Sequence, residues 1–173
     1  MKDGIHPNYN PVIFVDASNG DEIITKAALS SKDTRDIDGV KHYIINVDVT
    51  VILDGWFGDS SRMFVAGSTN KKNMDLLKTT YECLLIGIKE AKPGKTFGDI
   101  GFKIQEYAES KNYSVVKDFC GHGIGEQFHT PPSVLHYGAM GEGPEIKPGM
   151  FFTIEPMINL GDWKVKILND GWT

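Results

Sequence analysis

The sequence predicts an α+β protein with a mostly antiparallel sheet and helices on one face. A β-branched segment from Tyr43 to Leu53 alternates with the period of two that a strand requires. Two later segments, 73–91 and 97–111, carry apolar residues at helical spacing. Short strands are expected to return after these helices, and that order of elements is typical of an α+β fold.

Before residue 43 the chain is polar and rich in turn-forming residues. Val12–Val15 predicts a short strand, Asp16–Gly20 the turn after it, and the charged residues 30–38 a loop. The strand from Tyr43 to Leu53 follows. Asp54-Gly55 is a strong signal for a two-residue hairpin turn, so Ser61–Val65 is expected to be the returning strand.

The two predicted helices are separated by Pro93-Gly94, which lies just beyond the end of the first. Apolar stripes define both of them: Met74, Leu77, Tyr81, Leu84, Leu85 and Ile88 in the first, and Ile100, Ile104, Tyr107 and Ala108 in the second. After the helices we expect a strand over 113–116, a glycine-rich loop around His122, strands over 149–158 and 163–168, and a turn at 169–171.

The composition of the chain argues against several classes of function. The 173 residues suffice for one domain with a sizeable core, and 40% hydrophobic with 24% charged residues is ordinary for a globular protein. The net charge of −5 argues against a large nucleic-acid surface, and DNA is not expected as a partner. No apolar run could span a membrane and no signal peptide is evident. Cys83 and Cys120 form no CxxC motif and indicate free thiols in a reducing cytoplasm.

The predicted hairpin brings two aspartates together. With Asp54-Gly55 as the turn, Asp48 faces Ser61, and Asp59 lies on the same sheet face as Asp48, on the diagonal. Carboxylates held that close repel each other unless a proton or a cation lies between them. Taken singly, each aspartate is more simply a solvated surface residue.

Two histidines lie in or near the glycine-rich segment. His122 is flanked by Gly121, Gly123 and Gly125, which permit a close approach of ligand or backbone, although a lone histidine is more often a surface or core residue. His129 follows Phe128, and by itself it is a loop histidine. The glycines lack the spacing and the acidic partner of a nucleotide-binding fingerprint.

Glu155 ends an apolar stretch and precedes Pro156. It shares a strand face with Phe151 and Thr153, and burial of its carboxylate would be costly without a partner; an exposed strand end is the alternative. Two aspartates, one glutamate and one or two histidines form a donor set that suits Mn, Fe, Co or Zn, ions that activate water.

These residues carry a specific resemblance. The segment from Asn46 to Phe64 (NVDVTVILDGWFGDSSRMF) closely resembles type I methionine aminopeptidases, and four further motifs do so in the same order and spacing. They are Gly121–Gly125 (GHGIG), Phe128-His129, Gly149–Met157 (GMFFTIEPM) and Asp170–Thr173 (DGWT). The resemblance runs from about residue 46 to 173.

The resemblance implies a pita-bread fold and a hydrolase that removes the N-terminal methionine from nascent polypeptides. It implies Asp48 and Asp59 as hairpin metal ligands, with Asp59 bridging two divalent ions, and His122 and Glu155 as ligands of the ion that Asp59 shares. His129 would contact the scissile peptide and help to stabilise the transition state. Phe128 and Trp172 would line the pocket for the methionine side chain.

Two parts of the family pattern are not found in this sequence. The family's second bridging glutamate follows the Asp-Gly-Trp-Thr motif, and the sequence ends at Thr173. The family's upstream His-Gly-Ile-Pro motif has no match between residues 1 and 43. We therefore expect at most one firmly bound metal ion and weak or absent hydrolysis, where the family binds two ions.

Residues 1–45 resemble something else, the zinc-free type of bacterial large-subunit ribosomal protein thirty-one. The similar stretches are 1–9, 12–16 and 33–45. This implies a chimera of a ribosomal-protein-like segment, 1–45, and an aminopeptidase domain, 46–173. The alternative function is a non-catalytic fusion that binds ribosomes, or a decayed gene product. A proline-specific peptidase of the same fold is a third interpretation, and the motifs around Asp59 and His129 favour the methionine-specific type.

Overall fold

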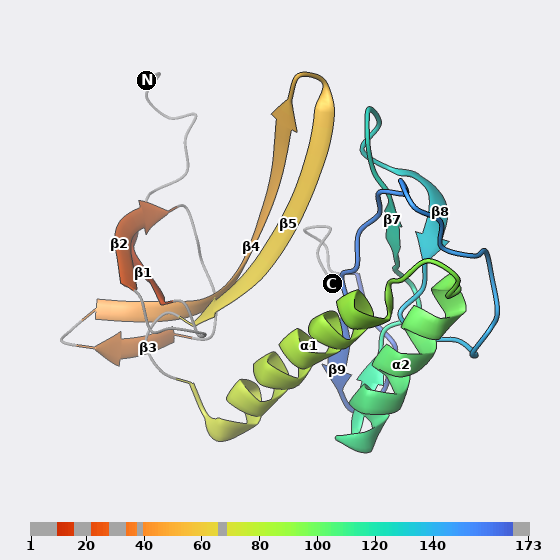
Figure 1. Cartoon of the computed structure of the whole chain (residues 1–173). Helices are drawn as coiled ribbons and strands as arrows, with labels where there is room; N and C mark the ends of the chain where they lie inside the picture. Colours follow the sequence, from red (N-terminus) through yellow and green to blue (C-terminus); the bar gives the residue numbers. More distant parts are fainter. Residues whose placement is uncertain (1–9, 16–21, 28–33, 38–39, 66–68, 168–173) are drawn as a thin grey trace. The chain divides into compact units, whose positions relative to one another are not determined.

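The computed structural model describes residues 10–15, 22–27, 34–37, 40–65 and 69–167, with side chains from Val47 onward. The chain divides into two units, and each is described by itself. One holds residues 1–49 and 60–71, and the other holds residues 50–59 and 72–173. Figure 1 gives the elements and their order.

The first unit is built from antiparallel strand pairs. β1 (Asn10–Val15) pairs with β2 (Glu22–Ala27), and β3 (Thr34–Ile37) pairs with β4 (Val40–Leu53). The strand predicted at 12–15 is confirmed. The loop predicted over 30–38 is wrong for 34–37, because backbone pairing with β4 outweighs the charged composition of this edge strand. The other residues of that loop, and the turn predicted at 16–20, lie outside the described residues.

The hairpin predicted from Asp54-Gly55 is confirmed. β4 and β5 (Trp56–Val65) are neighbours in a three-stranded sheet, and β5 begins earlier than expected, at Trp56. Asp54 and Gly55 both have positive φ, 52° and 85°, as a type I′ turn requires. A Cβ placed on Gly58 would lie 3.0 Å from Val51 Cγ2, so Gly58 faces Val51 as the two-residue turn demands.

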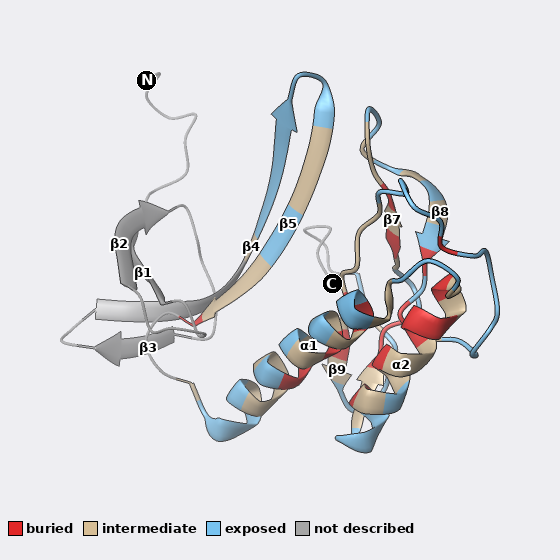
Figure 2. Ribbon diagram, viewed as in Figure 1, coloured by how far each residue is buried: buried red, intermediate tan, exposed pale blue. Residues whose placement is uncertain are grey.

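Two helices form most of the apolar core of the second unit. α1 (Lys71–Glu90) and α2 (Phe97–Ser110) match the predicted ranges within two residues. Their facing sides are buried in Figure 2, and the core contains Cys83, Phe97, Ile100, Ile104, Ala108, Val115, Val134, Ile146 and Ile158. Neither helix among the described residues combines the length and apolar character needed to cross a membrane.

Short antiparallel pairs complete this unit. β6 (Tyr113–Val115) pairs with β9 (Ile158–Leu160), and β7 (Gly121–Gly123) pairs with β8 (Thr130–Val134). The glycine-rich segment around His122 is therefore a strand and not the predicted loop. The antiparallel α+β fold is confirmed, although its sheets are small and separate.

Two predicted strands are wrong in whole or in part. Over 149–158 the backbone forms one isolated bridge, from Phe152 to Gly123, before β9 begins at Ile158. The Glu155 N–H donates to a histidine ring instead of a neighbouring strand, and Pro156 has no N–H to donate. Residues 163–167 form no strand, and residue 168 of that prediction lies outside the described residues.

Candidate metal centre

Three of the predicted ligands come together within the second unit. Asp59 comes from β5, His122 from β7, and Glu155 from the extended segment before β9. One donor atom of each lies within 4.8 Å of the others. His122 Nε2 lies 3.6 Å from Asp59 Oδ2 and 3.6 Å from Glu155 Oε1. The site is only partly open to solvent, since the side chains of Asp59 and His122 are 15% and 13% exposed.

Glycines on both sides of His122 let neighbouring backbones approach. A Cβ at Gly121 would lie 2.4 Å from the Thr153 carbonyl oxygen, and one at Gly123 would lie 2.3 Å from that of Pro131. Both distances are too short for any side chain. The close packing allows the Thr153 N–H to donate to the His122 carbonyl at 2.8 Å, which joins the segment that carries Glu155 to β7.

The hydrogen bonds of the His122 ring leave one nitrogen free to bind an ion. Nδ1 lies 3.0 Å from the Gly123 carbonyl oxygen, which can only accept, so Nδ1 carries the proton there. Nε2 is then the ring nitrogen available to an ion, and it lies 3.6 Å from one oxygen of each carboxylate. A ligand histidine whose other nitrogen donates to a backbone carbonyl is a common arrangement in metal sites.

Thr153 connects two of the ligands. Its hydroxyl accepts a hydrogen bond from the His122 N–H at 2.9 Å and donates one to Glu155 Oε1 at 2.7 Å. No role for Thr153 is predicted from the sequence. The signal was available, because the period of two places Thr153 on the same face as Glu155.

His136 is a second residue at the site for which the sequence predicts no role. It lies just beyond Leu135, the residue that follows β8, with no exposed surface, and its Nε2 accepts a hydrogen bond from the Glu155 N–H at 3.0 Å. Burial lowers the pKa of His136 to about 4, so the ring is neutral at pH 7. No local pattern marks this contact, which joins residues 19 positions apart.

Phe128 and His129 lie beside the triad, and their roles in binding and catalysis remain predictions. The centroid of the His122 ring is 4.3 Å from that of His129 and 5.5 Å from that of Phe128. Phe128 also contacts Phe57 at 5.7 Å, and the Phe57 N–H donates to the Gly125 carbonyl at 2.8 Å. These contacts hold the tip of the hairpin, and with it Asp59, against the segment that carries His122.

The other two predicted site residues are not placed with the triad. Asp48 lies on β4 in the first unit with an exposed side chain, and its role as a ligand remains a prediction. Trp172 lies outside the described residues.

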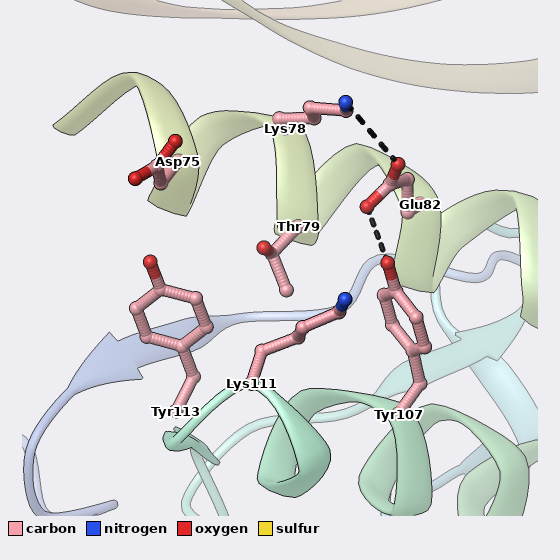
Figure 3. A pocket seen from close by; sticks show the side chains of 7 residues that line it. All are labelled: Asp75, Lys78, Thr79, Glu82, Tyr107, Lys111 and Tyr113. Atoms are coloured by element: carbon pink, nitrogen blue, oxygen red, sulfur yellow. Dashed lines mark hydrogen bonds and ion pairs between the residues drawn. The ribbon is translucent and has the colours of Figure 1, made fainter. Parts of the chain in front are cut away.

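A polar groove between α1, α2 and β6 is separate from these ligands. It encloses about 320 Å³ and is lined by Asp75, Lys78, Thr79, Glu82, Tyr107, Lys111 and Tyr113 (Figure 3). Glu82 accepts a hydrogen bond from the Tyr107 hydroxyl and lies 4.0 Å from Lys78 Nζ. The hydrogen bond to Glu82, with burial, raises the pKa of Tyr107 to about 12. Tyr107 therefore keeps its proton at pH 7 and links α2 to α1 through Glu82.

Fold and site together describe an α+β protein with a candidate carboxylate–imidazole metal centre. Residues 15–172 match the model of metallopeptidase family M24, and the chain belongs to that family. It is 53% identical over 131 residues to a methionine aminopeptidase of Rickettsia prowazekii, and 55% identical over 130 residues to methionine aminopeptidase A of a Synechocystis strain. Each match covers 75% of this chain and 51% of the relative.

The structure is similar to solved members of the family. The crystal structure of a methionine aminopeptidase from Thermotoga maritima matches with a TM-score of 0.74 and 31% identity, over 95% of this chain and 61% of that one. The pita-bread fold implied by the sequence is therefore confirmed. The chain spans about half the length of the curated relatives it matches.

The family match also bears on the N-terminal segment. It begins at residue 15 and so crosses the predicted boundary at residue 46. The comparisons do not show the resemblance of residues 1–45 to a ribosomal protein. That resemblance, and binding to ribosomes with it, stays a prediction.

Proposed function

We propose that this chain carries the metal-binding centre of a methionine aminopeptidase, which releases the N-terminal methionine of polypeptides. The observation that carries the proposal is the convergence of Asp59, His122 and Glu155 beside Phe128 and His129. Its relatives at more than 50% identity bear that enzyme name.

The donor set fits a divalent transition metal. Ligand bonds of about 2.1 Å allow two donors on one ion to lie at most about 4.2 Å apart, and the 3.6 Å separations of His122 Nε2 from the two carboxylates satisfy this limit. A cation also removes the repulsion between Asp59 and Glu155. Two carboxylates and an imidazole suit Mn, Fe, Co or Zn. When bound, such an ion polarises a carbonyl and lowers the pKa of water.

The residues around the centre have separate roles in this proposal. Asp59, His122 and Glu155 hold the ion, with Asp48 as a further ligand from the hairpin. His129 is exposed and contacts the His122 ring, from where it would donate a hydrogen bond to the scissile peptide. Phe128, with Trp172, offers an apolar wall to a methionine side chain.

Purified protein loaded with Co²⁺ or Mn²⁺ tests the proposal. Metal content after gel filtration measures binding, and a peptide panel measures specificity. We expect bound metal in wild-type protein and, among the peptides, preference for Met-Ala-Ser over Xaa-Pro substrates. The His129→Ala variant should bind metal like wild type and cleave more slowly, because His129 is proposed to act on the peptide and not on the ion.

The outcomes separate binding from catalysis. Protein that retains no metal would refute the centre itself. Metal-loaded protein that cleaves Xaa-Pro peptides in preference to Met-Ala-Ser would refute the methionine specificity but leave the centre standing.

A further inference from the structure

The Glu155 ligand lies on a segment that no strand holds in place. Residues 153–157 lie between the isolated bridge at Phe152 and the start of β9 at Ile158. The His122 carbonyl holds the Thr153 N–H, and the Val116 N–H donates to the Met157 carbonyl at 3.0 Å. The backbone of the ligand residue itself needs another support.

His136, which follows the end of β8, supplies that support. Its ring is completely buried, and its Nε2 receives the Glu155 N–H at 3.0 Å. A ring nitrogen that accepts must lack a proton, so the proton lies on Nδ1. Among the described residues Nδ1 has no hydrogen-bond partner, and a buried donor without a partner destabilises the fold. The ring's one polar contact in that part of the chain is thus made to a proposed metal ligand.

We propose that His136 is a positioning residue that fixes the Glu155 backbone and so holds its carboxylate in the metal centre. Thr153 fixes the carboxylate of the same residue through its hydrogen bond to Glu155 Oε1 at 2.7 Å. With both ends held, the carboxylate is ordered before the ion arrives. Loss of such outer contacts typically lowers metal affinity by about 10–100-fold. The inference rests on the proposed metal centre and adds to it a residue that does not touch the ion.

Three substitutions at this position separate positioning from simple core packing. His136→Gln keeps an acceptor near the position of Nε2, while His136→Asn carries its acceptor on a shorter side chain. His136→Leu has similar volume and no acceptor. Ala108→Gly serves as the matched control, because Ala108 is fully buried in α2 and the substitution weakens the helix without altering any contact of Glu155.

Co²⁺ titration by calorimetry and by visible absorption gives the main readout. We expect His136→Leu to bind Co²⁺ about 10–100-fold more weakly than wild type, with an altered ligand-field spectrum. His136→Gln should restore affinity and spectrum toward wild type. Ala108→Gly should lower the melting temperature and leave both unchanged. If His136→Leu does not fold, the Gln and Asn variants decide, with tighter binding expected for Gln.

NMR of the metal-free protein gives an independent readout. Long-range ¹H–¹⁵N spectra should show the His136 proton on Nδ1, and the Glu155 amide proton should shift in all variants that lack the acceptor. If all the His136 variants bind Co²⁺ as tightly as wild type, or if the His136 proton lies on Nε2, the positioning role is overturned while the metal centre stands. Wild-type protein that binds no Co²⁺ would overturn the metal centre, and the inference with it.

Discussion

The helix pair and the candidate metal centre belong to the same unit, but they differ in burial. The helices contact each other through fully buried side chains, whereas the proposed ligands stay partly exposed. Ile100 and Ile104 of α2 have no exposed surface and are held by apolar packing. In the centre, Asp59 and His122 keep 15% and 13% of their side chains exposed and Glu155 keeps 40%. The helices therefore form a support from which water is excluded (the dry support), while the candidate metal centre keeps part of its donor side chains exposed to solvent. Changes in one region should leave the property of the other intact.

The largest expected effect is a loss of stability without a loss of site chemistry. Ile104→Ala removes a fully buried side chain from α2 and should lower the free energy of unfolding by about 2–5 kcal/mol. Because Ile104 belongs to the apolar core and is not one of the proposed ligands, folded protein should bind Co²⁺ with wild-type affinity. Urea unfolding and Co²⁺ titration measure the two properties.

Ile88→Ala on α1 is the matched control, since Ile88 is 53% exposed. It makes the same chemical change in a helix and should cost well under about 1.5 kcal/mol. Equal losses for the two variants would contradict the assignment of the dry support to the α1–α2 contact.

The reverse effect is expected from a ligand. Asp59→Asn keeps the shape of the side chain and removes its charge, so Co²⁺ affinity should fall by more than about 100-fold, about 3 kcal/mol, which exceeds the usual effect of an outer contact. The metal-free protein should be at least as stable as wild type, because Asp59 no longer repels Glu155. Calorimetric titration and thermal unfolding give both values.

Asp118→Asn makes the same change on an exposed loop residue and should alter neither property. A large loss of stability in metal-free Asp59→Asn would show that the carboxylate supports the fold rather than an ion.

A third variant acts on both regions at once. In Gly121→Ala the added methyl group would meet the Thr153 carbonyl oxygen at 2.4 Å, so the backbones must separate. We expect unfolding to become easier by about 1–3 kcal/mol, as for other overpacked sites. Metal affinity should also fall, because the displaced segment carries Glu155. Urea unfolding with Co²⁺ titration again provides the test.

Gly125→Ala is the control within the same glycine-rich segment. Its methyl group would meet only the Trp56 ring, at an ordinary 3.4 Å. If both alanine variants behave alike, the close backbone approach at Gly121 is not what the centre depends on.

Much of the fold and of the candidate site could be predicted from the sequence. The helices follow from their apolar stripes, and the hairpin follows from Asp54-Gly55, because local turn chemistry and periodicity dictate both. The donor set of Asp59, His122 and Glu155 was predicted, since its members lie in a recognisable order along the chain.

The remaining features depend on contacts between distant residues. His136 contacts Glu155 through a single hydrogen bond across 19 positions, and no local pattern encodes such a bond. Thr153 lies two positions from Glu155, on the same face, but its bonds to His122 span 31 positions. The strand predicted over 149–158 failed for the same reason. Its apolar composition is suitable, but the partner of the Glu155 N–H is the side chain of His136, which only the folded chain brings close.

The smallest expected effect concerns the start of α2, at the edge of the dry support. The Asp99 carboxylate accepts hydrogen bonds from the Thr96 N–H at 2.8 Å and from the Gly141 N–H at 2.9 Å, in that order of effect on its pKa, and together they hold this pKa below its ordinary 3.8. A lowered carboxyl pKa stabilises the fold above pH 3.8, and the stabilisation is lost as the pH falls through the lowered value.

At pH 7, Asp99→Ala should therefore cost about 1 kcal/mol, as for other capping residues, and the difference from wild type should shrink in acid. Urea unfolding at pH 7 and at pH 3 or below measures it, with Glu106→Ala, an exposed residue of the same helix, as the control that should change little at either pH. A cost for Asp99→Ala that does not depend on pH would assign the effect to packing instead of to the charged cap.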